Sequence, residues 1–406
     1  MTVIFLLCYA YQFVYIPLTW FLRKKSRERK AAVEHSYAVL ICARNEERVI
    51  GDLLDSIAAQ TYDGVKVFVL ADNCTDSTAN IASGKGAVVY ERHDLTRVGK
   101  GFALEELRRR INGDYPEGFD GYFVFDADNI LAPDYIERMN ETFSEGADIV
   151  TSYRNSKNYG DNWISAGYAL WFLRESRYLN HARQLLGTSC AVSGTGFLFS
   201  RKVADEIGEW PYHLLTEDIE FSIDQITKGR KIAFCEDAEL YDEQPTKFSQ
   251  SWRQRLRWSK GYLQVFGKYG GKLIGGMLHG SFSCFDMSMV IMPAFTLSIL
   301  SVISNIVLGV WGALIGDDIM IAVRSIGGML ASMYLTLFLI GAVTTVTEWN
   351  HIRAGKWRKI ISVFTFPVFM FTYIPIAVCS FFAGREWKPI EHSVSAFEAG
   401  FAENPR

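Results

Sequence analysis

The chain has 406 residues, of which 49% are hydrophobic, and its formal net charge at pH 7 is −3. This length exceeds one typical domain, and the weakly acidic charge, without any basic-aromatic repeat, argues against nucleic acid as a partner. The seven cysteines show no C-x-x-C spacing and no nearby set of histidines. That pattern argues against a zinc site and against a disulfide framework.

The first 22 residues predict an N-terminal transmembrane helix. Residues 2–22 contain no charged side chain, and about 20 apolar residues suffice to cross the hydrocarbon core of a bilayer. A basic juxtamembrane segment follows at 23–34. A secretory signal peptide has its positive charges before the apolar run, which is the opposite order. We therefore expect a retained anchor whose C-terminal end lies in the cytoplasm.

Residues 35–246 predict an α/β domain with a mostly parallel, Rossmann-like sheet. Apolar runs of strand length alternate with segments of helical spacing, the strands at 37–42, 65–71, 87–90 and 121–125 and the helices at 46–60 and 100–110. Parallel sheets with crossover helices bind their ligands at the carboxyl ends of the strands. Polar clusters lie at three of these ends, namely Arg44-Asn45-Glu46, Asp72-Asn73 and Asp126-Ala127-Asp128.

The acidic triplet at 126–128 predicts a divalent-cation site. Asp126 and Asp128 would supply hard oxygen ligands for Mg²⁺ or Mn²⁺, while substrate phosphates and water complete the shell. The alternative is a carboxylate that only caps a turn, but the position of Asp126 directly after Tyr-Phe-Val-Phe favours the metal site. Asp72 has a similar alternative as a helix cap. Lys100 lies between two glycines, so it is either a surface lysine or a cation that can approach a phosphate closely.

Two further motifs lie downstream, Thr216-Glu217-Asp218 and Gln254-Arg255-Leu256-Arg257-Trp258. A carboxylate of the first can act as a general base, although the triplet can also cap the helix that the following spacing predicts. In the second, helical spacing places a diphosphate clamp and a stacking surface for a sugar on one helix face. The alternative is an amphipathic helix lying on the membrane surface.

The C-terminal third predicts a return to the membrane. Residues 247–284 would form interfacial helices, and 285–384 would form about three transmembrane or re-entrant segments before a tail at 385–406. The charge-free runs are 287–316, 325–347 and 360–383. The connection at 353–359 carries four basic residues and that at 316–318 carries none, so the former should face the cytoplasm. Pro367 and Pro375 favour a broken or re-entrant last segment over a straight span.

Taken in order, Asp72, Asp126-Ala127-Asp128, Thr216-Glu217-Asp218 and Gln254-x-x-Arg257-Trp258 resemble the motifs of the family 2 glycosyltransferases. The resemblance covers residues 36–270 in motif detail. It is greatest to membrane-embedded processive synthases of the cellulose, hyaluronan, chitin and poly-N-acetylglucosamine type. It implies a GT-A catalytic domain on the cytoplasmic side of a multi-pass plasma-membrane protein. Those relatives often have more membrane segments, which leaves open whether a homo-oligomer is needed to complete a channel.

The resemblance also implies a role for each site residue. Asp72 and the loop Arg44-Asn45-Glu46 would bind the base and ribose of a UDP-sugar, and Lys100 and Asp126 would lie near the diphosphate. Asp128 would be the direct metal ligand, and Asp218, next to Glu217, the general base. The remaining implied contacts are Gln254 and Arg257 with the diphosphate, Trp258 with the acceptor sugar, Gly194 and Thr195 in the loop beside that acceptor, and a gate at 241–248 over the donor.

These roles describe an inverting hexosyl- or N-acetylhexosaminyltransferase. The favoured function is synthesis and export of a β-linked polysaccharide on a growing glycan. The alternative is transfer of one sugar to a lipid or glycolipid, which the small number of membrane segments favours. A third interpretation, a membrane scaffold without turnover, is disfavoured by intact carboxylates at 126, 128 and 218. Membrane lipids would be partners in each case.

Overall fold

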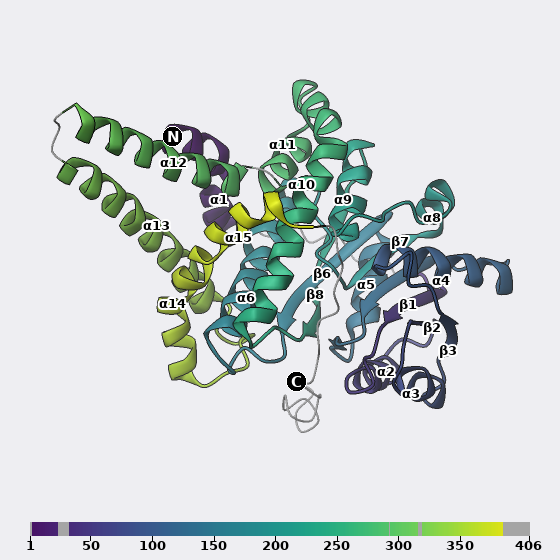
Figure 1. The fold of residues 1–406 in the computed structure, drawn as a ribbon. Coiled ribbons are helices and arrows are strands. Elements are labelled where there is room, and N and C mark those ends of the chain that lie inside the picture. Colours follow the sequence, from purple (N-terminus) through teal and green to yellow (C-terminus); the bar gives the residue numbers. More distant parts are fainter. Residues whose placement is uncertain (1, 23–31, 292, 316–318, 385–406) are drawn as a thin grey trace.

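The computed structural model describes residues 2–22, 32–291, 293–315 and 319–384. A twisted sheet lies in the middle of the molecule with helices on both of its faces, and the apolar helices gather at one side (Figure 1). The strands are β1 Tyr37–Ala43, β2 Val65–Asp72, β3 Val88–Arg92, β4 Gly121–Asp126, β5 Ile130–Leu131, β6 Ile149–Ser156, β7 Phe197–Ser200 and β8 Ile232–Asp242.

The helices fall into two groups, those between β1 and β8 in the chain and those before β1 or after β8. Those of the sheet domain are α2 Ile50–Ala58, α3 Thr78–Gly84, α4 Lys100–Asp114, α5 Tyr135–Ser144, α6 Trp163–Arg174, the π-helix η1 Glu175–Asn180, α7 His181–Leu186, α8 Arg201–Ile207 and α9 Glu217–Thr227. The others are α1 Thr2–Phe21, α10 Phe248–Leu278, α11 Phe282–Ile291, α12 Pro293–Leu314, α13 Ile319–Thr347, α14 Lys356–Phe371 and α15 Tyr373–Phe382.

The sheet confirms the predicted mostly parallel α/β architecture. Its strand order is β3-β2-β1-β4-β7-β6-β8-β5. The pairs β1–β2, β1–β4, β2–β3 and β6–β8 are parallel, whereas β7 runs antiparallel to both of its neighbours and β5 is antiparallel to β8. Alternate residues of one strand fill separate cores on the two faces, as Leu40 and Ile41 of β1 illustrate. This explains why the parallel strands are apolar throughout.

The helix expected at 46–60 is shorter in the structure, because α2 begins only at Ile50. Asn45 adopts a left-handed conformation with φ +58°, which turns the chain sharply after β1. The backbone N–H of Glu46 then donates to Thr78 Oγ1 at 2.8 Å instead of entering a helix. Residues 44–46 are thereby held as a loop at the sheet edge.

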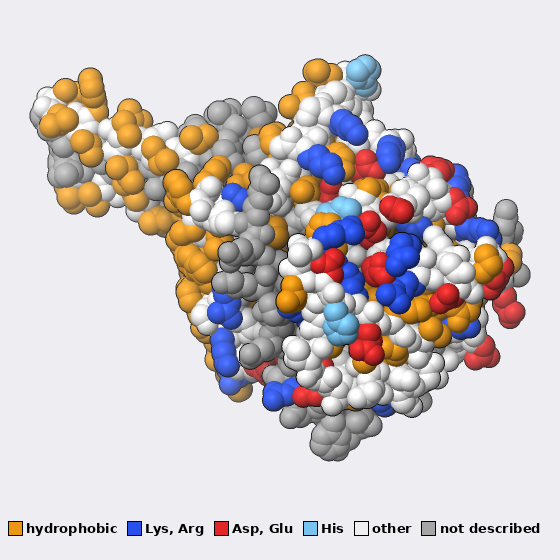
Figure 2. Space-filling model, turned by 45° about the vertical axis from the view of Figure 1, so that its right-hand side comes forward, with side chains coloured by type: hydrophobic (Ala, Val, Ile, Leu, Met, Phe, Trp, Pro, Cys, Tyr) orange, Lys and Arg blue, Asp and Glu red, His pale blue; other side chains and the backbone are white. Residues whose placement is uncertain are grey.

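Two described helices are long and apolar enough to cross a membrane by length and composition, Val323–Thr347 and Lys356–Phe382. Only 6% of the most apolar window of the first is buried, compared with 39% for the second. The hairpin of α12 and α13 projects away from the sheet domain (Figure 1). Figure 2 shows hydrophobic side chains covering this projection, while charged side chains gather on the rest of that face. The last segment is interrupted at Thr372, between α14 and α15.

The charge-free run at 287–316 is divided between two helices. Its first residues complete α11, where Met287 and Ile291 are buried in the core. The neighbouring Asp286 forms a buried ion pair with Arg183 of α7, with N to O distances of 2.7 and 3.0 Å. Tyr11 and Tyr15 of α1 donate hydroxyl hydrogen bonds to the same carboxylate, at 2.7 and 3.2 Å. The N-terminal helix is therefore fastened to the sheet domain by polar contacts. Residues 23–31 and 385–406, predicted as the basic segment and tail, lie outside the described residues.

Candidate functional site

The polar side chains predicted to form the site converge at the carboxyl ends of β1, β2 and β4. In the parallel register Cys42 of β1 is paired with Leu70 of β2 and with Asp126 of β4. The loop 44–46, Asp72 and Asp126 therefore leave the same edge of the sheet. This edge is where open α/β sheets bind their ligands.

Asp72 is buried in a network that includes an arginine the sequence did not single out. Its Oδ1 accepts hydrogen bonds from Arg92 Nη1 at 2.6 Å and from Asn73 Nδ2 at 2.9 Å. Burial raises the pKa of the Asp72 carboxyl, while Arg92 and the nearby Arg44 oppose this rise. Arg92 ends β3 directly opposite Asp72 in the strand register. Only that register would have identified it from the sequence.

The loop after β1 is tied to the loop after β2. Asn45 Oδ1 accepts a hydrogen bond from the backbone N–H of Thr75 at 2.8 Å. Asn73 is also left-handed, with φ +56°, and its side chain bonds both the N–H and the carbonyl of Asp94. Arg44, Asn45, Glu46 and Asp72 are thus brought to one place, as predicted, although what they bind remains a prediction.

The two predicted metal ligands, Asp126 and Asp128, together called the metal corner, lie at the turn that follows β4. Lys100 Nζ forms a close ion pair with Asp126 Oδ1 and also donates to the carbonyl of Gly194 at 2.8 Å. Asp128 is 5% exposed, and its Oδ2 accepts the backbone N–H of Glu243 at 2.9 Å. Burial disfavours charge on Lys100, yet the carboxylates of Asp126 and Glu217 raise its pKa above the ordinary value. Lys100 is therefore a charged, partly buried cation beside the acidic turn and not a surface lysine.

The donor set of this turn fits a hard divalent cation. Carboxylate oxygens of Asp126 and Asp128 are ligands that Mg²⁺ and Mn²⁺ accept. Within the described residues, no three acidic, histidine or cysteine side chains are grouped so that they could hold a metal by themselves. A cation held here would therefore need further oxygens from a bound phosphate or from water, as Mg²⁺ sites typically do.

Glu217 and Asp218 begin α9 as a pair of interacting acids. Burial first, and then repulsion from Asp218, raise the pKa of Glu217 to about 7, although Lys100 and Arg257 act in the opposite direction. Burial also raises the pKa of Asp218, and the backbone N–H of Ile219, Lys100 and the N–H of Gly194 limit the rise. Thr216 does not cap the helix through its side chain. The capping alternative therefore does not account for the triplet.

A glycine loop brings the acid pair close to Lys100. Gly194 has φ +80°, and a Cβ built on it would lie 4.0 Å from Asp218 Oδ2. The Gly194 carbonyl contacts Lys100 at the same time. Thr195 is turned inward, and its hydroxyl accepts the backbone N–H of Asp126 at 2.9 Å. The structure therefore places Gly194 beside Asp218 and Thr195 against the backbone of Asp126.

Gln254, Arg257 and Trp258 lie on α10, as the spacing predicts. The Oε1 atom of Gln254 is buried, and no hydrogen-bond partner reaches it among the described residues. Arg257 donates to the carbonyl of Leu215 at 3.4 Å and is close enough to favour ionisation of both Glu217 and Asp218. Trp258 packs edge-on against Tyr168 and Phe172, with ring centroids 5.7 and 6.2 Å apart. The predicted clamp and stacking side chain therefore adjoin the acid pair.

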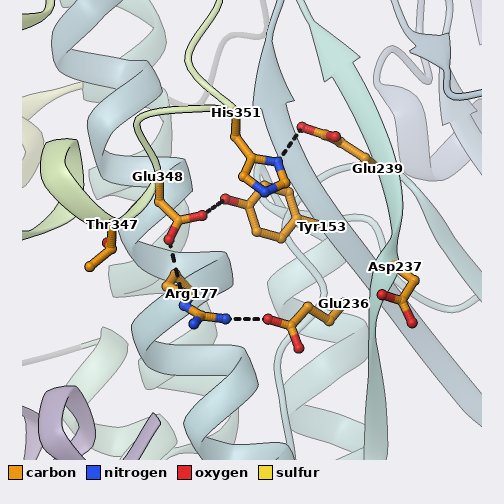
Figure 3. A pocket seen from close by; sticks show the side chains of 8 residues that line it. All are labelled: Tyr153, Arg177, Glu236, Asp237, Glu239, Thr347, Glu348 and His351. Carbon is orange, nitrogen blue, oxygen red and sulfur yellow. Dashed lines mark hydrogen bonds and ion pairs between the residues drawn. The ribbon is translucent and has the colours of Figure 1, made fainter. Parts of the chain in front are cut away.

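A separate cavity of about 330 Å³ lies between β6, β8, η1 and the turn after α13 (Figure 3). Its lining residues are Tyr153, Arg177, Glu236, Asp237, Glu239, Thr347, Glu348 and His351. Glu348 accepts a hydrogen bond from the Tyr153 hydroxyl and faces Arg177 at 3.5 Å. No predicted site residue lines this cavity. Its side chains instead join the α13 turn to the sheet.

Comparisons with known proteins show which families and structures this chain resembles. The model of "Glycosyltransferase like family 2" matches residues 35–261, which contain every site residue described above. The beta-monoglucosyldiacylglycerol synthase of Synechocystis sp. is 25% identical over 239 residues, covering 57% of this chain and 48% of that protein. The poly-beta-1,6-N-acetyl-D-glucosamine synthase of Staphylococcus aureus is 24% identical over 232 residues, covering 56% of this chain and 54% of that protein. The chain thus spans about half the length of these curated relatives.

Among solved structures, a mannosyltransferase from Pyrobaculum calidifontis in complex with GDP-Man and Mn²⁺ has a TM-score of 0.60. The two chains are 15% identical, and the match covers 95% of this chain and 98% of that one. At this identity the likeness shows a shared fold. Because it covers nearly all of both chains, the shared fold extends beyond the sheet domain.

Proposed function

The chain belongs to the glycosyltransferase-like family 2 and has a GT-A fold, and from this premise we propose that it transfers a sugar from a nucleotide-sugar to an acceptor at the membrane. The observation that carries the proposal is the convergence on Gly194. Its carbonyl binds Lys100, the cation paired with Asp126, and its N–H faces the Asp218 carboxylate. The residues proposed to bind the diphosphate and the residue proposed as the base thus meet at one loop.

The proposed donor is a UDP-linked hexose or N-acetylhexosamine. The buried Asp72 network and the loop 44–46 would hold the base and ribose, and Lys100 and Arg257 would hold the diphosphate. The names of the curated relatives refer to glucosyl and N-acetylglucosamine products, which supports this donor class. The structural relative was solved with GDP-Man, so a guanosine donor is the competitor that an assay must include.

The proposed reaction is a single displacement with inversion. Asp128, with Asp126, would hold Mg²⁺ or Mn²⁺, whose charge offsets that of the departing diphosphate. Lys100 and Arg257 add positive charge at the same place. Asp218 takes the proton of the acceptor hydroxyl as that oxygen attacks the sugar from the opposite face. A donor with an α-linkage therefore gives a β-linked product.

A pH profile tests the acid pair. The base works only when deprotonated, and the raised pKa values of Glu217, about 7, and of Asp218 move its titration upward. Turnover should therefore fall with decreasing pH at values above the range of an ordinary carboxyl. In Glu217→Gln the neighbouring negative charge is lost, so the acidic limb should move to lower pH. An unchanged limb in this variant, measured as kcat at saturating donor and metal, would contradict the coupling.

The proposed product is a β-linked polysaccharide, and Trp258 is the residue that tests acceptor binding. Trp258→Ala should raise the KM for the acceptor and shorten the products, while donor binding stays near normal, because the indole packs against Tyr168 and Phe172 and not against the diphosphate residues. Trp171→Ala is a matched control, since Trp171 packs against the same aromatic cluster. Equal product lengths in wild type and Trp258→Ala would exclude the acceptor role.

Product size also separates the two forms of the proposed function. A processive synthase gives a ladder that extends to high mass, whereas transfer to a lipid or glycolipid gives one added sugar per acceptor. The second form is favoured by the first curated relative, whose name is that of a glycolipid synthase. Gel filtration of the radiolabelled product distinguishes the two.

The proposed location is the plasma membrane, with several spans and a cytoplasmic sheet domain. Leu335 and Leu339 on α13 are 56% and 53% exposed, and in the proposed arrangement they would face lipid. A central Lys costs about 2.5–3.5 kcal/mol on insertion scales, so the double change of both leucines to Lys should strongly reduce the membrane-inserted fraction. The matched double change to Ala should leave it nearly unchanged. Equal resistance of both variants to carbonate extraction would contradict lipid contact at α13.

The decisive experiment incubates membranes containing the full chain with a panel of UDP-sugars and GDP-mannose, each with Mg²⁺ or Mn²⁺. Both nucleoside diphosphate release and product size are measured, with Asp218→Asn membranes as the background. Metal-dependent release with one donor supports the proposal. No release above background with any donor would favour the scaffold interpretation instead.

A further inference from the structure

Arg154 of β6 bridges three parts of the site, although no sequence motif marks it. Its Nε and Nη2 atoms both donate to Asp242 Oδ2, the former at 2.7 Å. Its Nη1 donates to the carbonyl of Ser193 at 2.8 Å. The guanidinium carbon lies 3.7 Å from the centre of the Phe172 ring. One planar group therefore contacts the end of β8, the glycine loop and α6.

The contact with Asp242 leads to the metal corner. The next residue, Glu243, donates its backbone N–H to Asp128 Oδ2 at 2.9 Å. The second oxygen of Asp242 accepts Gln244 Nε2 at 2.6 Å, so both carboxylate oxygens are held. Movement of Asp242 would carry with it the N–H that orients Asp128.

The contact with Ser193 leads to the base. The following residue, Gly194, has its carbonyl on Lys100 and its N–H facing Asp218. A shift of the Ser193 carbonyl would therefore move Gly194, which interacts with both Lys100 and Asp218. The third contact, with the Phe172 ring, leads to the proposed acceptor-binding residue, because Phe172 packs against Trp258.

We propose that Arg154 is a positioning residue, which holds the turn 242–244 and the loop 193–196 at a fixed separation, so that the metal carboxylate holds the donor where the base can activate the acceptor. This inference rests on the proposed function. Arginine suits the task because its planar fork donates in several fixed directions, whereas lysine offers a single point charge that cannot reproduce them. Stability alone does not explain the arrangement, since a buried ion pair is often no more stabilising than apolar side chains of similar volume.

The test compares Arg154→Gln and Arg154→Lys in the detergent-solubilised full chain. The first readout is Mn²⁺ binding in the presence of UDP, followed by the electron paramagnetic resonance signal of free Mn²⁺. Loss of a direct outer partner of a metal ligand typically costs about 10–100-fold in metal affinity. Arg154 acts one step further out, through Asp242 and Glu243, so we expect both variants to weaken Mn²⁺ binding by about 10-fold, the lower end of that range. Asp242→Asn should do the same, and the double variant Arg154→Gln/Asp242→Asn should add little to either.

Arg183→Gln is the matched control, because it also removes a buried arginine that binds a carboxylate twice, but far along the chain at Asp286. It should lower the thermal midpoint while the folded fraction binds Mn²⁺ and UDP as wild type does. Normal Mn²⁺ binding by Arg154→Lys would overturn the positioning role. A double variant in which the two losses of Mn²⁺ affinity add fully would overturn it as well. Wild-type protein that neither binds Mn²⁺ with UDP nor releases nucleoside diphosphate would overturn the proposed function and the inference together.

Discussion

Replacing Asp218 with asparagine should lower turnover by about 10²–10⁴-fold, the usual contribution of a positioned general base. The amide has the size of the carboxylate but cannot accept the acceptor's proton. Donor binding should survive, because Lys100 remains paired with Asp126 and bonded to the Gly194 carbonyl. Single-turnover rates, measured alongside equilibrium binding of the nucleotide sugar, separate these two effects.

The control for this variant lies on the same helix. Asp224→Asn removes a buried carboxylate that binds the Tyr212 hydroxyl and Lys228, so it should reduce stability and leave the rate of the folded enzyme near normal. Glu217→Gln distinguishes the two members of the acid pair. Near-normal turnover in Asp218→Asn together with a collapse in Glu217→Gln would assign the base to Glu217.

The fold was predictable where one physical signal dominated. Strands such as β1 and β4 are buried on both faces, so their sequences are continuous apolar runs, and that of β4 ends at Asp126. Because the carboxyl ends of parallel strands share an edge, Asp72 and Asp126 could be assigned to one site before any register was known. The helix spacing of Gln254, Arg257 and Trp258 likewise required no tertiary information.

The residues that the sequence did not reveal depend on pairing between distant strands. Arg92 ends β3, and Arg154 lies inside β6. An arginine at such a position ordinarily suggests a face of the strand that is exposed to solvent. Only the register that pairs Arg92 with Asp72, and the contact between Arg154 and Asp242, show them to be internal.

The division of the apolar run at 287–316 between α11 and α12 could not be read from the sequence for a related reason. Asp286 lies just before this run, and Arg183 neutralises it in the interior. A charged residue next to an apolar run can therefore be buried when an oppositely charged residue elsewhere in the chain neutralises it.

Replacing Asp128 with asparagine should lower turnover by roughly 10²–10³-fold, since a catalytic metal contributes several kcal/mol and each 1.36 kcal/mol is tenfold in rate. A neutral amide is a weaker ligand for a hard divalent cation. The backbone N–H of Glu243 still finds an oxygen at this position, so the fold should persist. Mn²⁺ binding in the presence of UDP should weaken in parallel with the rate.

Chelation provides the discriminating comparison. EDTA should reduce the wild-type rate to near that of Asp128→Asn and should have little further effect on the variant, because two losses that act through one metal do not add. Asp134→Asn is the matched control, since its exposed carboxylate pairs only with Arg138 among the described ion pairs. Asp126→Asn should behave differently from both, because it also leaves Lys100 without its carboxylate and so should change diphosphate binding even in the absence of metal. If EDTA lowered the rate of Asp128→Asn by the same factor as that of wild type, the metal would have to lie elsewhere than on Asp128.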